Sequence, residues 1–489
     1  MAFLSALYAL HVDDAVQNVA GTVYAGAAIG AVFAGDMFTL FVFWELLTIS
    51  ATFLILARRT EKALGAGFRY FMVHVAGGLC LLAGIIMHVS QTGSATFDLI
   101  GLGTTASWLM FVGIGVNCAW PVLHPWLTDA YPEATITGTV FLSAFTTKTA
   151  VLALILLFPG EPVLIGIGLF MVMYGIIYAL LENNIRRILA FSIVNQVGFM
   201  VCAIGIGTPL ALNGAAAHAF AHIIYKALLF MSAGVVVYRT GFNKCTEVGG
   251  LFRTMPLTAV CGIVGALAIS GFPLTSGFTT KTMISQAAAD ESLAVVYFLL
   301  AAASAGVFLH AGIKFPWFVF FQRDSGLRPK DAPWNMAVAM VFFSVLCILF
   351  GVAPQLLYDF LPYPVDYQAY TAGKVVFYLQ LLLFSGLAFF LLLPLMKRTE
   401  TISLDFDWLW RVALFRVASG TFAVAAAVGG AVTAAAGSVL ARLRVVATRY
   451  LGTSGDDTRP GVLARTWPIG VTALWIALLL TAYVVIYYF

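Results

Sequence analysis

The stretch FTLFVFWELLTISATFLIL, residues 38–56, is almost wholly apolar. A helix needs roughly 20 such residues to cross about 30 Å of hydrocarbon, because each residue adds about 1.5 Å. Inside a bilayer, only helices and closed barrels satisfy their own backbone hydrogen bonds. Runs of this kind recur along the whole chain of 489 residues. The sequence therefore predicts an all-helical polytopic membrane protein with about 12–14 transmembrane helices, some of them broken at mid-membrane.

The composition excludes several classes of protein. Only 10% of the residues are charged, whereas about 25% are charged in a soluble protein. The net charge of +4 comes without a basic patch interleaved with aromatic side chains, so nucleic-acid binding has no support. No GxGxxG or P-loop string joins a strand to a helix, so no nucleotide site is expected. The cysteines form no CxxC pair, so no metal site and no cofactor are predicted; they are Cys80, Cys118, Cys202, Cys245, Cys261 and Cys347.

The loops between the apolar runs indicate how the chain crosses the membrane. Alternation of the spans puts the basic loops on one side, which the positive-inside rule makes cytoplasmic. These loops are ARRTEK (57–62), ENNIRR (182–187), YRTGFNKCTEVGGLFR (238–253), QRDSGLRPKD (322–331) and LMKRTE (395–400). The loop HPWLTDAYPEA (124–134) belongs on the same side but is acidic. The spans are expected over 17–35, 37–57, 68–89, 106–123, 136–158, 162–181, 187–206, 212–238, 293–320, 334–353, 376–396 and 466–489.

One helix is expected to be interrupted. Between 255 and 288 the helical pattern meets SGFPLTSG, in which Gly271, Pro273 and Gly277 unwind a helix. Broken helices are tolerated at membrane depth where their backbone lines a polar cavity. An ordinary turn outside the membrane, between two short helices, is the alternative.

The chain divides into three predicted parts. Residues 1–400 form the transmembrane bundle, 401–465 an amphipathic or lateral segment, and 466–489 a final span. The Ala/Gly-rich run within 411–444 is long enough to cross the membrane, but crossing would carry arginines to the outer side, against the charge bias. These arginines are Arg442, Arg444, Arg449, Arg459 and Arg465. We therefore expect a helix that lies along the cytoplasmic side, with a crossing helix as the alternative. The first apolar run, MAFLSALYAL, is too short to span and suggests a start partway into a helix.

Four ionisable residues lie within apolar runs, where a charge costs about 2.5 to 3.5 kcal/mol even on the lenient insertion scale. They are Glu45, Lys148, Lys226 and Lys281. Glu45 and Lys148 are the natural pair, because opposite buried charges lower each other's desolvation cost. A static ion pair is one interpretation. The functional one is that Lys148 releases its proton when the glutamate moves away, which an arginine could not do.

The stretch HAFAHIIYKALLF, residues 218–230, places His218, His222 and Lys226 at four-residue intervals. This spacing puts them on one helix face, about 6 Å apart along the axis. One or two waters fit such a gap, and histidine titrates near pH 6.5, so the pattern is typical of a proton wire. A zinc site is disfavoured, because the same face carries a lysine and no cysteine or carboxylate.

Other titratable groups are secondary candidates. His124, Asp129 and Glu133 suggest a cytoplasmic entrance. His310 and Lys314, four residues apart, are as consistent with snorkelling groups as with relay members. His74 and His88 are interpreted as packing or interfacial residues.

Five strings together resemble the antiporter-like subunits shared by Mrp-type sodium/proton antiporters, complex I and membrane-bound hydrogenases. They are WELLTIS (44–50), PVLHPWLTDAYPEATITGTVFLSAFTTKTAV (121–151), NNIRRILAFSIVNQVGF (183–199), HAFAHIIYKALLFMSAG (218–234) and GFPLTSGFTTKTMI (271–284). The resemblance covers residues 17 to about 395. Residues 129–151 are most similar to the D subunit of the Mrp group.

The resemblance implies a proton path across the middle of the membrane. In it, Glu45 matches the essential glutamate of the family, Lys148 and Lys226 match connecting lysines, and Lys281 matches the ionisable residue of the second broken helix. Asn117 stands where most members carry a central lysine, and asparagine cannot carry a proton. Lys148 would then be the main partner of Glu45.

The resemblance also implies partners and a location. Members are subunits of larger complexes in the cytoplasmic membrane of bacteria or archaea, and any redox centres lie on other subunits. The first hypothesis is a non-enzymatic sodium/proton antiporter subunit, which moves protons and sodium. The second is a proton-pumping subunit of a redox-driven complex or of an inorganic-carbon uptake system. The third is a non-conducting scaffold, which Asn117 favours.

Overall fold

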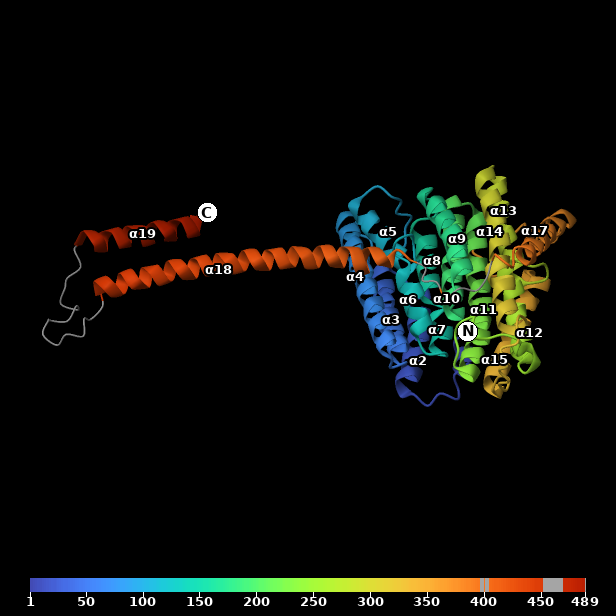
Figure 1. Cartoon of the computed structure of the whole chain (residues 1–489). Coiled ribbons are helices and arrows are strands. Elements are labelled where there is room, and N and C mark those ends of the chain that lie inside the picture. The colour runs from blue at the N-terminus through green and yellow to red at the C-terminus, as the bar shows by residue number, and fades with distance from the viewer. Residues whose placement is uncertain (396–399, 401–403, 452–468, 489) are drawn as a thin grey trace. The chain divides into compact units, whose positions relative to one another are not determined.

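The computed structural model describes residues 1–395, 400, 404–451 and 469–488, and every regular element among them is helical (Figure 1). Twelve helical segments in these ranges are long and apolar enough to cross a membrane. The predicted all-helical polytopic fold is therefore confirmed. The elements are α1 (Ala2–Tyr8), α2 (Ala15–Val32), α3 (Met37–Leu56), α4 (Glu61–Thr92), α5 (Thr105–Asn117), α6 (Pro125–Glu133), α7 (Gly138–Leu142), α8 (Thr146–Leu157), α9 (Val163–Leu181), α10 (Ile185–Ile206), α11 (Pro209–Thr240), η1 (Leu251–Arg253), α12 (Pro256–Ser270), α13 (Ser276–Asp290), α14 (Ala294–Val307), η2 (Phe308–Lys314), η3 (Trp317–Phe321), α15 (Trp334–Val352), α16 (Gln355–Tyr358), α17 (Ala372–Leu391), η4 (Leu409–Leu414), α18 (Phe415–Leu451) and α19 (Ile469–Tyr488).

The core of the bundle lies around α10 and α11. The apolar window of α10 is 100% buried and that of α11 is 83% buried, whereas the outer helix α17 is 22% buried. Small residues bring α9 and α10 together, because a Cβ atom at Gly168 or Gly198 would collide with the backbone of the other helix. Helices in membranes commonly pack closely through small residues of this kind. The central position of α10 and α11 keeps their polar side chains away from lipid.

Three of the predicted basic loops lie together at one end of the bundle. The amide of Cys245 donates to the carbonyl oxygen of Asn183 at 2.9 Å, and the amide of Ser325 donates to Gly249 at 3.1 Å. The loops 182–187, 238–253 and 322–331 are thus hydrogen-bonded in series. The predicted alternation of the spans is confirmed at these loops.

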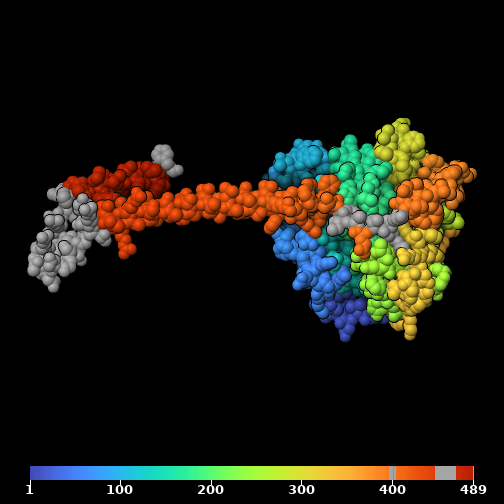
Figure 2. Space-filling view, viewed as in Figure 1, coloured from blue at the N-terminus to red at the C-terminus, as the bar shows by residue number. Residues whose placement is uncertain are grey.

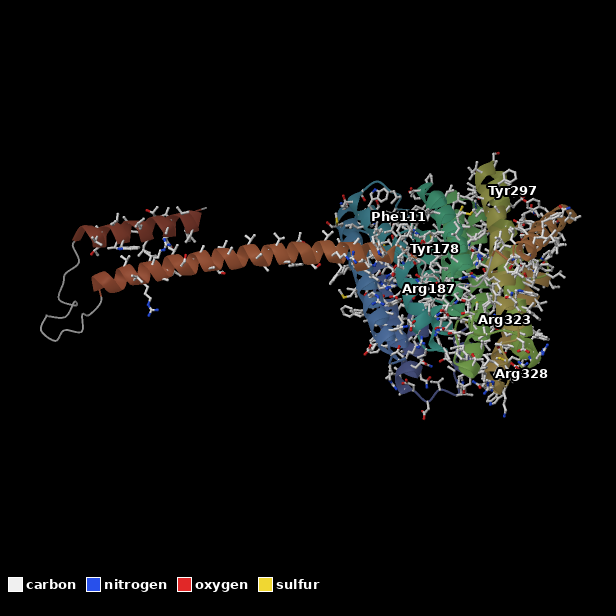
Figure 3. All side chains as sticks on the ribbon, in the orientation of Figure 1. Phe111, Tyr178, Arg187, Tyr297, Arg323 and Arg328 are labelled. Atoms are coloured by element: carbon white, nitrogen blue, oxygen red, sulfur yellow. The ribbon has the colours of Figure 1, made fainter. Side chains whose placement is uncertain are left out.

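The two ends of the bundle differ in their side chains. Figure 3 shows Arg323 and Arg328 near one end, and Phe111 and Tyr297 toward the other. Arg328 forms an ion pair of 2.6 Å with Asp324 in the same basic loop. The basic end is the one that the positive-inside rule associates with the cytoplasm.

The acidic loop 124–134, which departed from the charge pattern, has basic partners. Glu133 forms an ion pair of 3.1 Å with Arg58, and Asp129 forms one of 2.8 Å with Arg69. The carboxylates therefore lie against arginines from the neighbouring basic region, so their negative charge is balanced locally. Asp129 and Glu133 are engaged in these pairs.

The predicted helix break between 255 and 288 is confirmed. α12 ends at Ser270, and Gly271 follows with a φ of 76°, in the left-handed region that glycine tolerates. The next helix, α13, begins at Ser276. A Cβ at Gly277 would collide with the carbonyl oxygen of Ala268, so only glycine allows the two half-helices to approach.

The single span expected over 106–123 is wrong in its second part. α5 ends at Asn117, and α6 begins only at Pro125. Between them, Ala119 and Val122 have φ angles of 57° and 71°, which non-glycine residues rarely adopt. Pro121 lies inside this segment and Pro125 begins α6, so prolines mark a break that the run of apolar residues did not predict.

A second unpredicted break divides the span expected over 136–158. α7 ends at Leu142 and α8 begins at Thr146, with Ser143 to Phe145 as the connection. The break leaves carbonyl groups at the end of α7 without helical partners. The ammonium of Lys148 binds one of these carbonyls, that of Ser143, at 2.6 Å.

The chain forms two compact units, residues 1–406 and 407–489. In the second unit, α18 is a single long helix (Figure 2), and its side chains over 415–446 are exposed apart from the half-buried Ala418. The domain boundaries predicted at 401 and at 466 fall among residues outside those described, as do Arg459 and Arg465.

Candidate functional site

The three residues predicted to form a ladder on α11 are all buried inside the bundle. His218, His222 and Lys226 are each 0% exposed. The ring centroids of His218 and His222 are 6.4 Å apart, which matches the spacing of one helical turn. Among the described residues, no hydrogen-bond partner exists for either ring nitrogen of His222 or for the ammonium of Lys226. Such buried groups require water as their partner.

Unlike His222, His218 is fixed by hydrogen bonds at both ring nitrogens. Its Nδ1 lies 2.9 Å from the hydroxyl of Thr280, and its Nε2 lies 3.2 Å from the amide oxygen of Gln196. The hydroxyl of Tyr225 donates to the same Gln196 oxygen at 3.0 Å. His218 therefore links α11 to both α10 and the second half of the broken helix.

Lys148 and Lys281 occupy equivalent local positions. Each lies in the pentapeptide FTTKT, at 145–149 and at 278–282, directly after a helix break. The ammonium of Lys281 donates to the carbonyl of Ile269, near the end of α12, at 2.6 Å. Lys148 makes the corresponding bond to Ser143 at the end of α7. A charged lysine complements the partial negative charge of a helix C-terminus, so each break supplies its own binding site for an ammonium.

The central groups interact electrostatically. Lys148 is close enough to repel positive charge on His222 and on Lys226, and Lys281 does the same to His218 and Lys226. The ammonium of Lys281 also lies 4.8 Å from the ring centre of Phe199, a cation–π contact. Lys148, Lys281 and the three residues on α11 therefore belong to one buried cluster.

Glu45 lies against α4, in a space that only glycine leaves open. A Cβ atom at Gly78 would overlap the Oε1 oxygen of Glu45. This oxygen is buried and has no hydrogen-bond partner among the described residues. The predicted pairing of Glu45 with Lys148 is not present, because the ion pairs of the described residues do not include it and the ammonium of Lys148 is bound to Ser143 and Thr147.

Asn117 ends α5 at the first break. Its side chain is 1% exposed, and its Oδ1 oxygen has no partner among the described residues. The indole of Trp126 donates to the carbonyl of Val116 at 2.8 Å, which fastens α6 to the end of α5. An uncharged amide thus occupies the turn where a charged group was expected from the resemblance.

Asp405 is a buried residue that sequence reasoning missed. Its Oδ1 oxygen lies 2.9 Å from Nε2 of His124, and it accepts from Tyr174 at 2.6 Å. Its Oδ2 oxygen accepts from the hydroxyl of Thr128 at 3.2 Å. Burial alone raises the pKa of Asp405, but the interactions with His124, together with hydrogen bonds from Tyr174 and from the Phe406 amide, lower the pKa below its ordinary value. The carboxylate is therefore charged at neutral pH, and it holds His124 at the first helix break. Neither periodicity nor a motif signals it, since Asp405 lies in a polar segment, 281 residues from His124.

His124 was predicted to form a cytoplasmic entrance together with Asp129. The structure separates their roles, because His124 is 1% exposed and binds Asp405, while Asp129 binds Arg69. His124 is thus a buried structural partner of the segment that closes the first unit.

Replacing Asp405 with alanine is expected to open the first break. Cys118, directly after α5, is 0% exposed in the native protein and serves as a reporter. Removing one partner of a buried hydrogen-bonded pair costs several kcal/mol, so we expect Cys118 to react with N-ethylmaleimide at least about tenfold faster. Per-cysteine mass spectrometry measures this rate. Glu400→Gln is the control, since Glu400 forms an exposed ion pair of 3.5 Å with Lys244; an equal rate at Cys118 in the alanine variant would contradict the prediction.

His310 and Lys314 lie on the π-helical segment η2. The ammonium of Lys314 donates to three carbonyls at the end of α9, including that of Glu182 at 2.6 Å. The ammonium of Lys314 therefore caps the end of α9 and does not extend toward the membrane–water interface as a snorkelling group would. His310 is 0% exposed, interacts electrostatically with Lys226, and has an Nε2 atom without a partner among the described residues. Single π-helical turns are frequent at functional sites.

Known proteins resemble this chain over much of its length. A family model described as NADH:quinone oxidoreductase/Mrp antiporter, transmembrane, matches residues 34–308. Hydrogenase-4 component B of Escherichia coli (strain K12) is 26% identical over 372 residues, covering 68% of this chain and 55% of that protein. One Na(+)/H(+) antiporter subunit of Alkalihalophilus pseudofirmus is 27% identical over 386 residues, covering 68% of this chain and 47% of that protein. The chain thus matches about half the length of these two relatives.

A solved structure has a similar fold. A chain of the membrane-bound sulfane sulfur reductase, an archaeal respiratory membrane complex, superposes with a TM-score of 0.69 at 23% sequence identity. The superposition covers 99% of this chain and 87% of that one.

Proposed function

The chain belongs to the NADH:quinone oxidoreductase/Mrp antiporter transmembrane family, and from this membership we propose that it is a proton-translocating subunit of a multisubunit cation/proton antiporter. The finer assignment is exchange of sodium for protons, in a complex like those of the Mrp group. The partners would be other membrane subunits in the cytoplasmic membrane of a bacterium or archaeon. The subunit itself performs no chemistry beyond moving protons.

One observation carries this proposal. His222 and Lys226 are wholly buried, and no described residue binds their side-chain nitrogens. Burying unpaired polar groups costs free energy, and packing alone does not justify placing two of them one turn apart. Water beside these groups would let each accept a proton from one neighbour and pass it to the next.

We propose different tasks for the relay residues. His218 is fixed at both nitrogens, so it orients Thr280 and Gln196 around the path. His222 has both nitrogens free, so it is the histidine that accepts and releases protons. Lys148 and Lys281 hold positive charge against helix ends at either side of the α11 ladder. Because these charges repel one another, a proton that arrives at one lysine favours the departure of a proton from the next.

His310 is proposed as a further relay member, since its Nε2 atom has no partner among the described residues and the ring interacts electrostatically with Lys226. Lys314 is proposed as a structural cation. Asn117 carries no proton in this scheme, and Asp129 remains in its ion pair with Arg69.

The second unit is proposed to contain a helix that lies in the plane of the membrane. α18 has 37 residues, which corresponds to a length of about 55 Å at about 1.5 Å per residue. A bilayer core is only about 30 Å thick, so a helix of this length suits a lateral position. Cysteines introduced at Ala418 and Ala441 and labelled from either side would test it. Labelling of the two positions from opposite sides would show that the helix crosses.

The proposed function is tested in everted membrane vesicles that contain the whole complex. A pH-sensitive dye reports the proton gradient, and sodium is added to dissipate it. We expect sodium to collapse the gradient in the wild type and not in Glu45→Gln. Equal collapse in both would favour a non-conducting scaffold. A gradient that appears only when an electron donor is supplied would favour a redox-driven complex, the alternative that the hydrogenase relative suggests.

A further inference from the structure

Glu45 and Lys148 lie on the same proposed path, yet no direct contact joins them. Asn117, the position at which the resemblance led us to expect a charged group, carries an uncharged amide at the end of α5. The helix α4 offers a route, because Tyr70, His74 and Gly78 recur at four-residue intervals along it. Residues at this spacing share a face, each about 6 Å from the next along the axis. Gly78 lies beneath the carboxylate of Glu45.

His74 lies one turn from Gly78 and is oriented by its neighbours. Its ring is stacked on Tyr70 with centroids 3.9 Å apart and meets the Trp126 ring edge-on at 4.4 Å. Its Nδ1 atom lies 2.9 Å from the carbonyl oxygen of Tyr70. A carbonyl only accepts hydrogen bonds, so Nδ1 carries the hydrogen of the neutral ring and Nε2 is left as an acceptor. This Nε2 atom is buried and has no partner among the described residues.

Beyond His74, a cluster of hydroxyl groups leads to Lys148. The hydroxyl of Thr146 lies 3.5 Å from that of Tyr70 and 2.6 Å from that of Tyr24. The next residue, Thr147, accepts a hydrogen bond of 3.1 Å from the ammonium of Lys148. Hydroxyl groups both donate and accept, so they can pass a proton without becoming charged for long.

We propose that His74 is a relay residue that carries the proton between Glu45 and the hydroxyl groups beside Lys148. This inference rests on the proposed function, and it names the residue that would connect Glu45 to Lys148 in the proposed proton path. The proton enters at Nε2 from the Glu45 side, through one bridging water, and leaves from the same Nε2 toward Tyr70 and Thr146. Nδ1 keeps its hydrogen throughout, because the Tyr70 carbonyl holds it. The ring therefore gains one proton and loses one proton in each passage.

The competing interpretation is that His74 only packs between two aromatic rings. His74→Phe separates the two, since phenylalanine preserves the stacking and lacks the nitrogen. We expect the rate of proton translocation by the assembled complex in vesicles to fall at least about tenfold, because positioned proton carriers commonly contribute that much or more. His88→Phe is the matched control on the same helix, and its rate should equal that of the wild type. A His74→Phe rate within about twofold of the wild type would overturn the proposal.

Chemical rescue provides a second measurement. In His74→Ala, added imidazole should restore translocation in a concentration-dependent manner, which a lost packing contact would not allow. If His74→Phe does not assemble, this variant decides the question, and absence of rescue overturns the proposal. The proposed function fails separately, when Glu45→Gln is as active as the wild type. The His74 assignment fails when Glu45→Gln is inactive and His74→Phe is not.

Discussion

Replacing Lys148 with arginine is expected to stop proton translocation while leaving the fold in place. Arginine keeps the positive charge and can still donate to the Ser143 carbonyl at the end of α7, but it does not release a proton at any physiological pH. Loss of a proton-transfer group commonly lowers a rate by about 10²- to 10⁴-fold, and we expect at least the lower end of that range. Dye-monitored proton uptake in vesicles that contain the assembled complex measures the effect.

A matched control separates charge from proton release. Lys314 is also buried and also caps a helix end, that of α9, yet it is assigned a structural role. Lys314→Arg should therefore retain most of the wild-type rate, while Lys148→Arg should not. A Lys148→Arg variant that translocates protons at the wild-type rate would remove Lys148 from the path. A large loss of the translocation rate in both variants would mean that a guanidinium group does not fit in place of the lysine ammonium, and that proton release is not the cause of the loss.

Gly78→Ala is expected to impair translocation nearly as much as Glu45→Gln, although it changes no titratable group. A Cβ atom at this position overlaps the Oε1 oxygen of Glu45, so the carboxylate must move away from the α4 face. Misplacement of a reacting group by about 1 Å can cost about 10²-fold in rate. The measurement is the same vesicle assay, with the amount of assembled complex determined by purification.

Gly26→Ala serves as the control for this prediction. A Cβ at Gly26, on α2, meets no atom within 4 Å, and alanine is the better helix former by about 1 kcal/mol. Its rate should match that of the wild type. Wild-type translocation in Gly78→Ala would show that the position of Glu45 against α4 is unimportant, and it would also weaken the route through His74.

The fold could be predicted largely from apolar run length and loop charge. The span expected over 37–57 is α3, Met37–Leu56, and the one expected over 334–353 is α15, Trp334–Val352. These signals are local, because hydrocarbon thickness fixes helix length and every backbone group must be satisfied within its own segment. The break after Ser270 was also predictable, since glycine and proline mark it in the sequence.

The break at Ser143 was not predictable in the same way, whereas Pro121 and Pro125 mark the break after Asn117 and were overlooked. Ala119 and Val122 have unusual φ angles in that break, and single-sequence patterns do not report where tertiary contacts impose such angles. The repeated FTTKT pentapeptide was the available signal for the second break, because a lysine placed just inside a helix can bind the carbonyl freed before it.

The predicted relay lysines and histidines lie buried and Glu45 half-buried, but the predicted ion pair is not present. Charge complementarity suggested that Glu45 binds Lys148, whereas the lysine is satisfied by a carbonyl and a hydroxyl. Backbone carbonyls at a helix end compete with carboxylates for an ammonium, and only the structure reveals where those carbonyls are. The roles of these residues remain predictions for the assays above.

The contact between His124 and Asp405 has a consequence for biosynthesis. A ribosome makes the chain from its N-terminus at about 5 to 20 residues per second, so some tens of seconds of translation pass between these two residues, which are 281 positions apart. During that interval the imidazole of His124 lacks the carboxylate of Asp405 as its hydrogen-bond partner. The segment around His124 therefore reaches its final contacts only after Asp405 has been synthesised. A chain that ends before position 405 lacks the buried partner of His124.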